Sequence, residues 1–171
     1  LFSDILISNL STSDDTTVLI KAIESNDKVI DIHHAGTAMR FLTAYFAFYT
    51  KKTIKLTGSE RMQNRPIKVL VDALIDLGAN IEYENISGYP PLIIHPSGIS
   101  KHEVQLQADV SSQFISAIML SASKLPKGLV IKFTSEITSL PYINMTVQLM
   151  EKLGIKIDFI DNIIRVFPNS S

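Results

Sequence analysis

The stretch Asp31-Ile-His-His-Ala-Gly-Thr-Ala-Met-Arg40 decides the fold, because it leads from a short apolar strand into a strongly apolar helix and its pattern returns later in the chain. Small and polar residues open the helix here, and Ser111-Ser112-Gln113 opens a similar apolar helix in the second half. In both places a further helix start follows 29 positions later, from Thr37 to Pro66 and from Ser112 to Pro141. The equal spacing predicts one structural unit that occurs twice.

The two copies predict a β-α-β-α-β-β unit at residues 29–96 and another at residues 104–168. Residues 1–28, with one strand and one helix, are interpreted as the remnant of a first unit. Because the helices are apolar on most sides while the strands alternate, we expect buried helices with small sheets outside them. The predicted fold class is therefore α/β (α+β), with residues 1–171 forming one globular domain.

Hydrophobic periodicity and turn residues give the expected elements. Strands are expected at residues 4–9, 29–32, 53–57, 80–83, 92–95, 104–107, 129–133, 156–159 and 163–167. Helices are expected at residues 11–23, 36–49, 66–77, 112–123 and 141–153. Asp14 and Asp15 are interpreted as first-turn acids of the first helix, where the helix dipole favours negative charge.

The composition is that of a globular chain, with 46% hydrophobic and 19% charged residues and a net charge of −1. The near-neutral charge argues against a nucleic-acid partner, and the lack of cysteine excludes disulfide and thiolate chemistry. No apolar run reaches the roughly 18–20 residues of a membrane helix, and no signal-peptide pattern occurs. We therefore expect a cytoplasmic protein with no membrane partner. The chain begins with Leu1 rather than Met and stops just after a strand, so we expect it to be part of a longer protein.

Two positions near the first pair of helix starts predict an anion site. Gly36 follows a strand and opens a helix, where free backbone N–H groups favour anions and the lack of a side chain allows close approach. Arg61 and Arg65 precede the next helix, although a helix N-terminus disfavours positive charge. A bound carboxylate or phosphate relieves that conflict. An ordinary tight turn at Gly36 and a solvated loop remain the alternatives; we favour function for Arg65 and solvation for Arg61.

The second copy offers hydroxyl and amide groups in the same places. Ser111, Ser112 and Gln113 suit a phosphate and a neighbouring sugar-like hydroxyl, with a plain serine N-cap as the alternative. Ser139 and Tyr142 repeat the arrangement at the following helix start. No metal site is expected, because adjacent histidines on a strand face opposite sides and no ligand spacing occurs. His34, close to Gly36, is a further candidate for a ligand contact.

Six segments in order along the chain resemble the 5-enolpyruvylshikimate-3-phosphate synthase family, the shikimate-pathway enzymes that glyphosate inhibits. They are Ala35-Gly-Thr-Ala-Met-Arg40, Arg61-Met-Gln-Asn-Arg-Pro-Ile67, Leu77-Gly-Ala79, Tyr89-Pro-Pro-Leu92, Ser111-Ser-Gln-Phe114 and Ser139-Leu-Pro-Tyr-Ile143. The resemblance implies one half of the inside-out α/β barrel of the enolpyruvyl transferases, in which six such units form two globular halves. The chain differs from the related enzymes that act on UDP-N-acetylglucosamine, because those enzymes usually carry a reactive cysteine and this chain has none.

The resemblance also implies a reaction. Such enzymes transfer the enolpyruvyl group of phosphoenolpyruvate to the 5-hydroxyl of shikimate 3-phosphate, on the route to chorismate and the aromatic amino acids, with no metal or organic cofactor. By resemblance, Ser111, Ser112, Gln113, Ser139 and Tyr142 bind shikimate 3-phosphate. Gly36, Arg65 and Gln113, with His34 as an additional candidate, bind phosphoenolpyruvate. The general base and several cationic residues are expected in the other half, so we expect this part to be inactive alone and the full-length enzyme to be a monomer.

The chain also departs from the family pattern. His33-His34 stands where members often have Gly-Asn, and Phe41 stands where many have proline. The family's Lys-Ser-x-Ser-x-Arg segment is expected before Leu1. Two alternatives stay open, a non-catalytic module that binds another phosphorylated ligand and a structural repeat domain that binds nothing alone.

Overall fold

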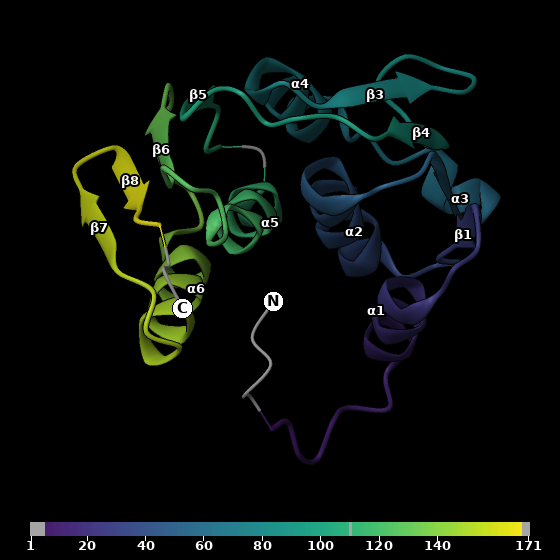
Figure 1. Cartoon of the computed structure of the whole chain (residues 1–171), viewed down its shortest axis with the longest axis horizontal. Coiled ribbons are helices and arrows are strands. Elements are labelled where there is room, and N and C mark those ends of the chain that lie inside the picture. Colours follow the sequence, from purple (N-terminus) through teal and green to yellow (C-terminus); the bar gives the residue numbers. More distant parts are fainter. Residues whose placement is uncertain (1–5, 110, 169–171) are drawn as a thin grey trace.

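The computed structural model describes residues 6–109 and 111–168 and contains two four-stranded sheets with helices between them (Figure 1). The first half comprises α1 (Asp14–Glu24), β1 (Val29–Asp31), α2 (Gly36–Tyr49), β2 (Ile54–Thr57), α3 (Glu60–Gln63), α4 (Lys68–Leu77), β3 (Asn80–Tyr83) and β4 (Leu92–His95). The second half comprises β5 (Glu103–Leu106), α5 (Ser112–Ala122), β6 (Leu129–Phe133), α6 (Leu140–Lys152), β7 (Ile157–Ile160) and β8 (Ile163–Val166).

The two sheets have the same topology. Their strand orders are β1-β2-β4-β3 and β5-β6-β8-β7. In each sheet the first two strands are parallel, because a helix crosses over between them, and the remaining pairs are antiparallel. Ile30 pairs with Leu56 in the first sheet, and Val104 pairs with Ile131 in the second, so an apolar pair faces the helices in both.

The helices fill the space between the sheets. Figure 1 shows α2 and α5 side by side at the centre, with the first sheet on one side and the second on the other. Both helices are buried over most of their length, which explains why their sequences are apolar on nearly all sides. Their largest fully buried side chains include Met39, Leu42, Ile115 and Ile118. The predicted α/β class with buried helices and outer sheets is confirmed.

Most predicted elements lie within two residues of those observed. The helix expected at residues 11–23 begins three residues late, at Asp14, because Ser13 is its N-cap, and three further differences stand out. The strand expected at residues 4–9 is absent from its described part, residues 6–9, which pair with no described strand. The helix expected from Pro66 begins at Lys68, because the Ile67 N–H bonds to the Gly88 carbonyl and Ile67 is not helical. The short helix α3 was predicted as a loop. None of the helices in the described ranges is long and apolar enough to cross a membrane.

Candidate anion-binding site at the helix N-termini

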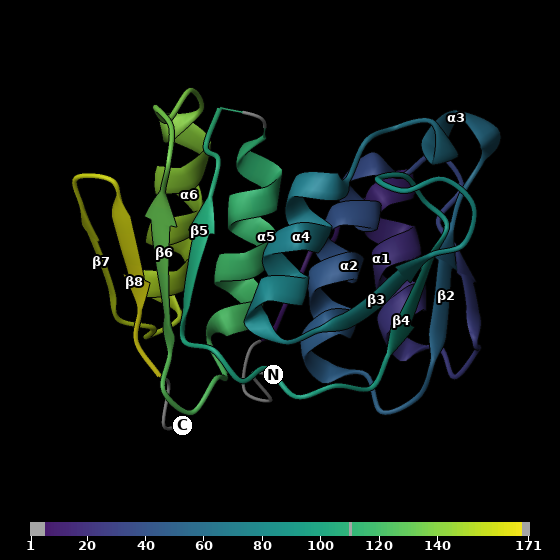
Figure 2. The same ribbon diagram turned by 90° about the horizontal axis from the view of Figure 1, so that it is seen from above.

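The helices α2, α5 and α6 all begin at one edge of the molecule, which lies at the top of Figure 2. The parallel strands β1, β2, β5 and β6 end at this edge, so every strand-to-helix turn opens there. Free N–H groups at three helix N-termini therefore collect on one side of the fold, where they favour negatively charged ligands.

A buried hydrogen bond fixes the starts of α5 and α6 beside each other. The hydroxyls of Ser116 and Thr146 lie 2.7 Å apart, and both residues are buried. Thr146 also donates to the Tyr142 carbonyl at 3.1 Å, so Ser116 is the donor in the first bond. Ser112 and Tyr142 each lie one helical turn before a member of this pair. The predicted residues of the second unit are thus neighbours, although they are 30 positions apart in sequence.

The start of α5 presents the predicted hydroxyl and amide groups. Ser111 is the N-cap residue, and its Oγ accepts a bond from the Gln113 N–H at 3.3 Å. The Gln113 side chain reaches across to α2, where its amide Nε2 donates to Oγ1 of Thr37 at 3.3 Å. Ser111, Ser112 and Gln113 are all half-buried at the rim. This bond joins the α2 end of the site to the α5 end.

The start of α6 is more exposed. Ser139 is its N-cap residue and is half-buried, and Pro141 stands in the first turn as predicted. Tyr142 is 63% exposed, so its side chain is accessible to a ligand. Ser135 supports the preceding loop by accepting from the Ala108 N–H and donating to Asp109, both at 2.9 Å.

Two guanidinium groups lie against the start of α2. A side chain at Gly36 would meet Nη1 of Arg65 at 2.5 Å and Nη1 of Arg40 at 3.0 Å, so a larger residue would push these guanidinium groups away from the helix end. Arg40 donates to the Gly36 carbonyl at 2.5 Å and lies 5.9 Å from the centroid of the Phe114 ring. Arg65 is exposed, so its guanidinium is open to an anion next to the helix end.

The pair of arginines is electrostatically strained. Burial lowers the pKa of Arg40 most, and the neighbouring charge of Arg65 lowers it further, while Asp15 acts in the opposite direction. Two cations side by side repel each other, and a bound anion would reduce that repulsion. The structure brings Gly36, Arg65 and Gln113 to the start of α2, where the resemblance implies contacts with phosphoenolpyruvate; those contacts stay a prediction.

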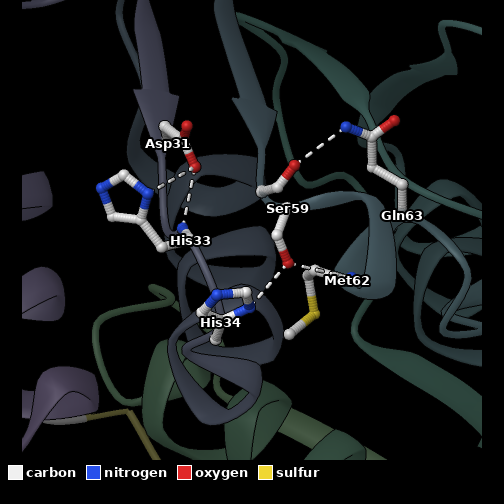
Figure 3. Close-up of polar contacts among 7 residues, drawn as sticks. Asp31, His33, His34, Ser59, Met62 and Gln63 are labelled. Carbon is white, nitrogen blue, oxygen red and sulfur yellow. Dashed lines mark hydrogen bonds and ion pairs between the residues drawn. The ribbon is translucent and has the colours of Figure 1, made fainter.

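His34 contacts a different group from the one expected. Its Nδ1 lies 2.8 Å from Oγ of Ser59, the N-cap residue of α3, and the side chain points toward that serine in Figure 3. The Ser59 N–H also donates to the His33 carbonyl at 3.0 Å. These bonds tie the β1–α2 turn to the segment that leads to Arg65. A direct ligand contact by His34 stays a prediction.

His33 directs its side chain to Asp31 and not to Ser59. Its N–H donates to Oδ1 of Asp31 at 2.8 Å, its Nδ1 lies 3.7 Å from the same oxygen, and its φ is +50° (Figure 3). His33 and His34 point apart, but they lie in the turn after β1 and not on the strand that the sequence predicted. Within residues 6–109 and 111–168, no cluster of three or more histidine or acidic side chains is placed to hold a metal ion.

Sequence reasoning missed two residues of this site, Asp15 and Arg40. Asp15 was interpreted as a first-turn acid of its own helix, but its Oδ1 accepts hydrogen bonds from the N–H groups of Thr37 and Ala38, at 2.9 and 3.2 Å. The available signal was the N-cap position of α2, where Ala35 has no side-chain oxygen to cap the helix. A helix that lacks its own cap needs an acceptor from elsewhere.

Comparison with known proteins agrees with this fold. The family model described as EPSP synthase (3-phosphoshikimate 1-carboxyvinyltransferase) matches residues 6–171. A 3-phosphoshikimate 1-carboxyvinyltransferase of Bacteroides fragilis strain YCH46 is 51% identical over 88% of this chain, and one of Actinobacillus pleuropneumoniae serotype 3 is 37% identical over 88%. The chain covers 37% of the length of each of these relatives.

A solved structure shows the same fold at low sequence identity. The EPSP synthase from Acinetobacter baumannii superposes with a TM-score of 0.71 at 18% identity, over 86% of this chain and 32% of the other. The resemblance stated from the six sequence segments is confirmed by the family model and by the sequence relatives. This chain belongs to the EPSP synthase family.

Proposed function

We propose that this chain forms the shikimate 3-phosphate-binding part of a 3-phosphoshikimate 1-carboxyvinyltransferase. The complete enzyme would transfer the enolpyruvyl group of phosphoenolpyruvate to the 5-hydroxyl of shikimate 3-phosphate and release phosphate, in the cytoplasm, on the way to chorismate. Family membership and the names of the relatives support the reaction. The observation that supports the site is the bond from Gln113 to Thr37, which joins two helix N-termini into one polar rim.

The proposed roles follow from the chemistry of each group. Ser111, Ser112, Gln113, Ser139 and Tyr142 would hold the phosphate and hydroxyls of shikimate 3-phosphate, since hydroxyls, amides and helix N–H groups suit both. Gly36 and Arg65, with Gln113, would hold phosphoenolpyruvate, because a guanidinium beside a free N–H matches a carboxylate or phosphate. His34 would be an additional contact for phosphoenolpyruvate. No metal or organic cofactor is proposed.

We further propose that the chain alone does not turn over. It spans 37% of the length of its relatives, and the family resemblance places the general base in the other half of the enzyme. Catalysis in a cleft also requires closure that excludes water and completes the catalytic set. In this proposal residues 1–171 are one globular half, with units at residues 29–96 and 104–168 and the remnant of a third at residues 1–28. The full-length enzyme would be a monomer that glyphosate inhibits.

Calorimetric titration with shikimate 3-phosphate tests the proposal, with shikimate and inorganic phosphate as controls. Ser112→Ala should weaken binding about tenfold or more, because a hydrogen bond to a charged group contributes roughly 1.5–3 kcal/mol. Ser87→Ala is the matched control, since Ser87 is an exposed serine in the turn between β3 and β4. A Ser112→Ala protein with unchanged affinity would contradict the assignment.

Two other results separate the remaining possibilities. Equal affinity for shikimate 3-phosphate and inorganic phosphate would favour a general anion-binding module over a substrate-specific one. An unchanged melting temperature with every ligand would favour a structural domain that binds nothing alone, since a ligand that binds only the folded state must stabilise it. Phosphate release from the two substrates by the purified chain would refute the proposed inactivity.

A further inference from the structure

The carboxylate of Asp15 binds two of the N–H groups at the start of α2 and leaves the first one, that of Gly36, without a partner among the described residues. One oxygen of Asp15 accepts from both Thr37 and Ala38, which lie 22 and 23 positions further along the chain. The Gly36 N–H makes no hydrogen bond to any other described residue. A helix N-terminus normally offers several free N–H groups to an anion, and here a side chain from α1 already occupies two of them.

The two cations at this helix end differ in burial. Arg40 is half-buried, and its Nε is buried without a hydrogen-bond partner in the described part of the chain. Asp15 lies close enough to Arg40 to counteract part of its pKa depression. Arg65 lies over Gly36 and is exposed. The negative charge of Asp15 thus acts on the more buried of the two cations, and the exposed Arg65 is left for a ligand.

The position of Asp15 also limits where an anion can bind. A second negative group on the Thr37 and Ala38 amides would have to displace the carboxylate and would be repelled by it. An anion over Gly36 does not have to displace the carboxylate, feels less of its repulsion, and meets Arg65. That place is also adjacent to Gln113, whose side chain already touches Thr37.

We propose that Asp15 is a specificity-determining positioning residue, which occupies the Thr37 and Ala38 amides so that an anionic ligand is directed to the Gly36 N–H and Arg65. The identity of the ligand as phosphoenolpyruvate rests on the proposed function. The positioning by Asp15 concerns any small anion at this helix end, so inorganic phosphate serves as the probe.

Amide NMR of the ¹⁵N-labelled chain tests this positioning, with inorganic phosphate added to the wild type and to Asp15→Ala. In the wild type, phosphate should shift the Gly36 amide signal strongly and those of Thr37 and Ala38 weakly. In Asp15→Ala, all three signals should shift together. Phosphate affinity should also rise about two- to fivefold, the usual effect of one charge at a helix end.

Two further variants separate charge and contact. Asp15→Asn retains an acceptor oxygen without the charge, so phosphate affinity should rise while the Thr37 and Ala38 signals remain weakly responsive. Asp14→Ala removes the same charge from the neighbouring exposed position on α1, and we expect the wild-type pattern there. A purely structural cap would lower the melting temperature in Asp15→Ala without changing which amides respond. If Asp15→Ala does not fold, the wild type still decides the question, because the inference requires a strong Gly36 shift beside weak Thr37 and Ala38 shifts.

Three results would overturn the inference. These are equal shifts of the three amides in the wild type, an unchanged pattern in folded Asp15→Ala, and no response of Gly36 to phosphate at all. Failure of the proposed function looks different. In that case shikimate 3-phosphate binding would not depend on Ser112, while phosphate would still report on Gly36.

Discussion

The starts of α2 and α5 occupy equivalent places in two sheets of identical topology, but they are closed in different ways. Ser111 caps α5 with its own hydroxyl, two residues from the N–H that it binds. Asp15 caps α2 from a different helix, 22 positions away. The comparison teaches that a repeated backbone leaves the chemistry of its helix ends free to diverge. One end is held locally and is neutral, and the other is held by a distant charge.

The segments that lead to the second helix of each unit, α4 and α6, also differ in charge. The segment before α4 carries Arg61 and Arg65, whereas the segment before α6 carries Ser139 and Tyr142. The first sheet-and-helix set therefore supplies cations to the rim, and the second supplies hydroxyls. In the proposed function the cations face phosphoenolpyruvate and the hydroxyls face shikimate 3-phosphate, so each of the two ends serves one substrate.

The largest expected effect tests whether the two halves fold as one body. Leu42 on α2 and Ile118 on α5 are fully buried, and these two helices pack against each other. Leu42→Ala and Ile118→Ala should each lower the free energy of unfolding by about 2–5 kcal/mol, from lost burial and the cavity left behind. Denaturant unfolding followed by circular dichroism measures both.

The number of unfolding transitions shows whether the two halves of the chain unfold together or separately. If α2 and α5 form a single core, either substitution should shift one cooperative transition of the whole chain. Ile75→Ala, at a 43%-exposed position on α4, is the control and should change stability by much less. Two separate transitions, each sensitive to only one substitution, would mean that the halves unfold independently.

A smaller effect should distinguish the two glycines that end α4 and α6. Gly78 has φ +111° and Gly154 has φ +80°, so alanine at either position is strained by about 1–2 kcal/mol. An added side chain at Gly78 would also meet the Gly98 carbonyl at 2.8 Å, whereas nothing lies within 4 Å at Gly154. Overpacking typically costs a further 1–3 kcal/mol or so. Gly78→Ala should therefore destabilise more than Gly154→Ala in chemical denaturation, and equal losses would contradict the difference in packing.

These glycines also show how far the sequence leads. Leu77-Gly78 and Leu153-Gly154 predicted both helix ends, because a left-handed residue after a helix is usually glycine. The strands, buried helices and repeat were likewise predicted, since alternation and apolar periodicity are local signals. The crowding at Gly78 was not predicted, because it depends on a segment twenty residues further along the chain.

Some residues of the candidate site were likewise predicted from the sequence, and others were not. Gly36, Arg65 and Ser111–Gln113 were predicted from polar or small residues next to apolar helices. Asp15 and Arg40 were not predicted. The partners of Asp15 depend on how α1 packs on α2, and the environment of Arg40 depends on its burial. Neither can be inferred from the spacing of residues in the sequence. The helix α3 was also missed, since four residues are too few to show a periodicity.

The division into cations and hydroxyls predicts different responses to phosphoenolpyruvate. Arg65→Ala should weaken its binding about tenfold or more, because a hydrogen-bonded charge partner is lost. Arg61→Ala is the matched control, since Arg61 is an exposed residue of α3. Calorimetry measures the affinities. If Ser112→Ala weakened phosphoenolpyruvate binding more than Arg65→Ala, the division between the two ends would be wrong.

The smallest effect concerns the hydroxyl that joins the two halves. Tyr49 on α2 donates a hydrogen bond to the Ser121 carbonyl on α5. Burial, and then the neighbouring Tyr45, raise the pKa of Tyr49 to about 12, although a backbone hydrogen bond with Lys124 lowers it in part. A phenol that ionises less readily when folded stabilises the chain fully below the unfolded pKa of about 10. That stability is lost as the pH rises from about 10 to about 12.

Tyr49→Phe removes both the bond and the titrating group. At pH 7 it should cost about 1 kcal/mol, the usual net contribution of one hydrogen bond. Between pH 10 and 12 its stability should fall less steeply than that of the wild type, so the two curves converge. The fall should not vanish, because burial and then Asp72 raise the pKa of Tyr83 on β3 to about 12 as well. Tyr83→Phe is therefore the matched variant within the first sheet, and denaturant unfolding at several pH values compares them. Parallel curves for wild type and Tyr49→Phe would show that the Tyr49 hydroxyl is not buried between α2 and α5, and that the two halves meet less closely there than the structure describes.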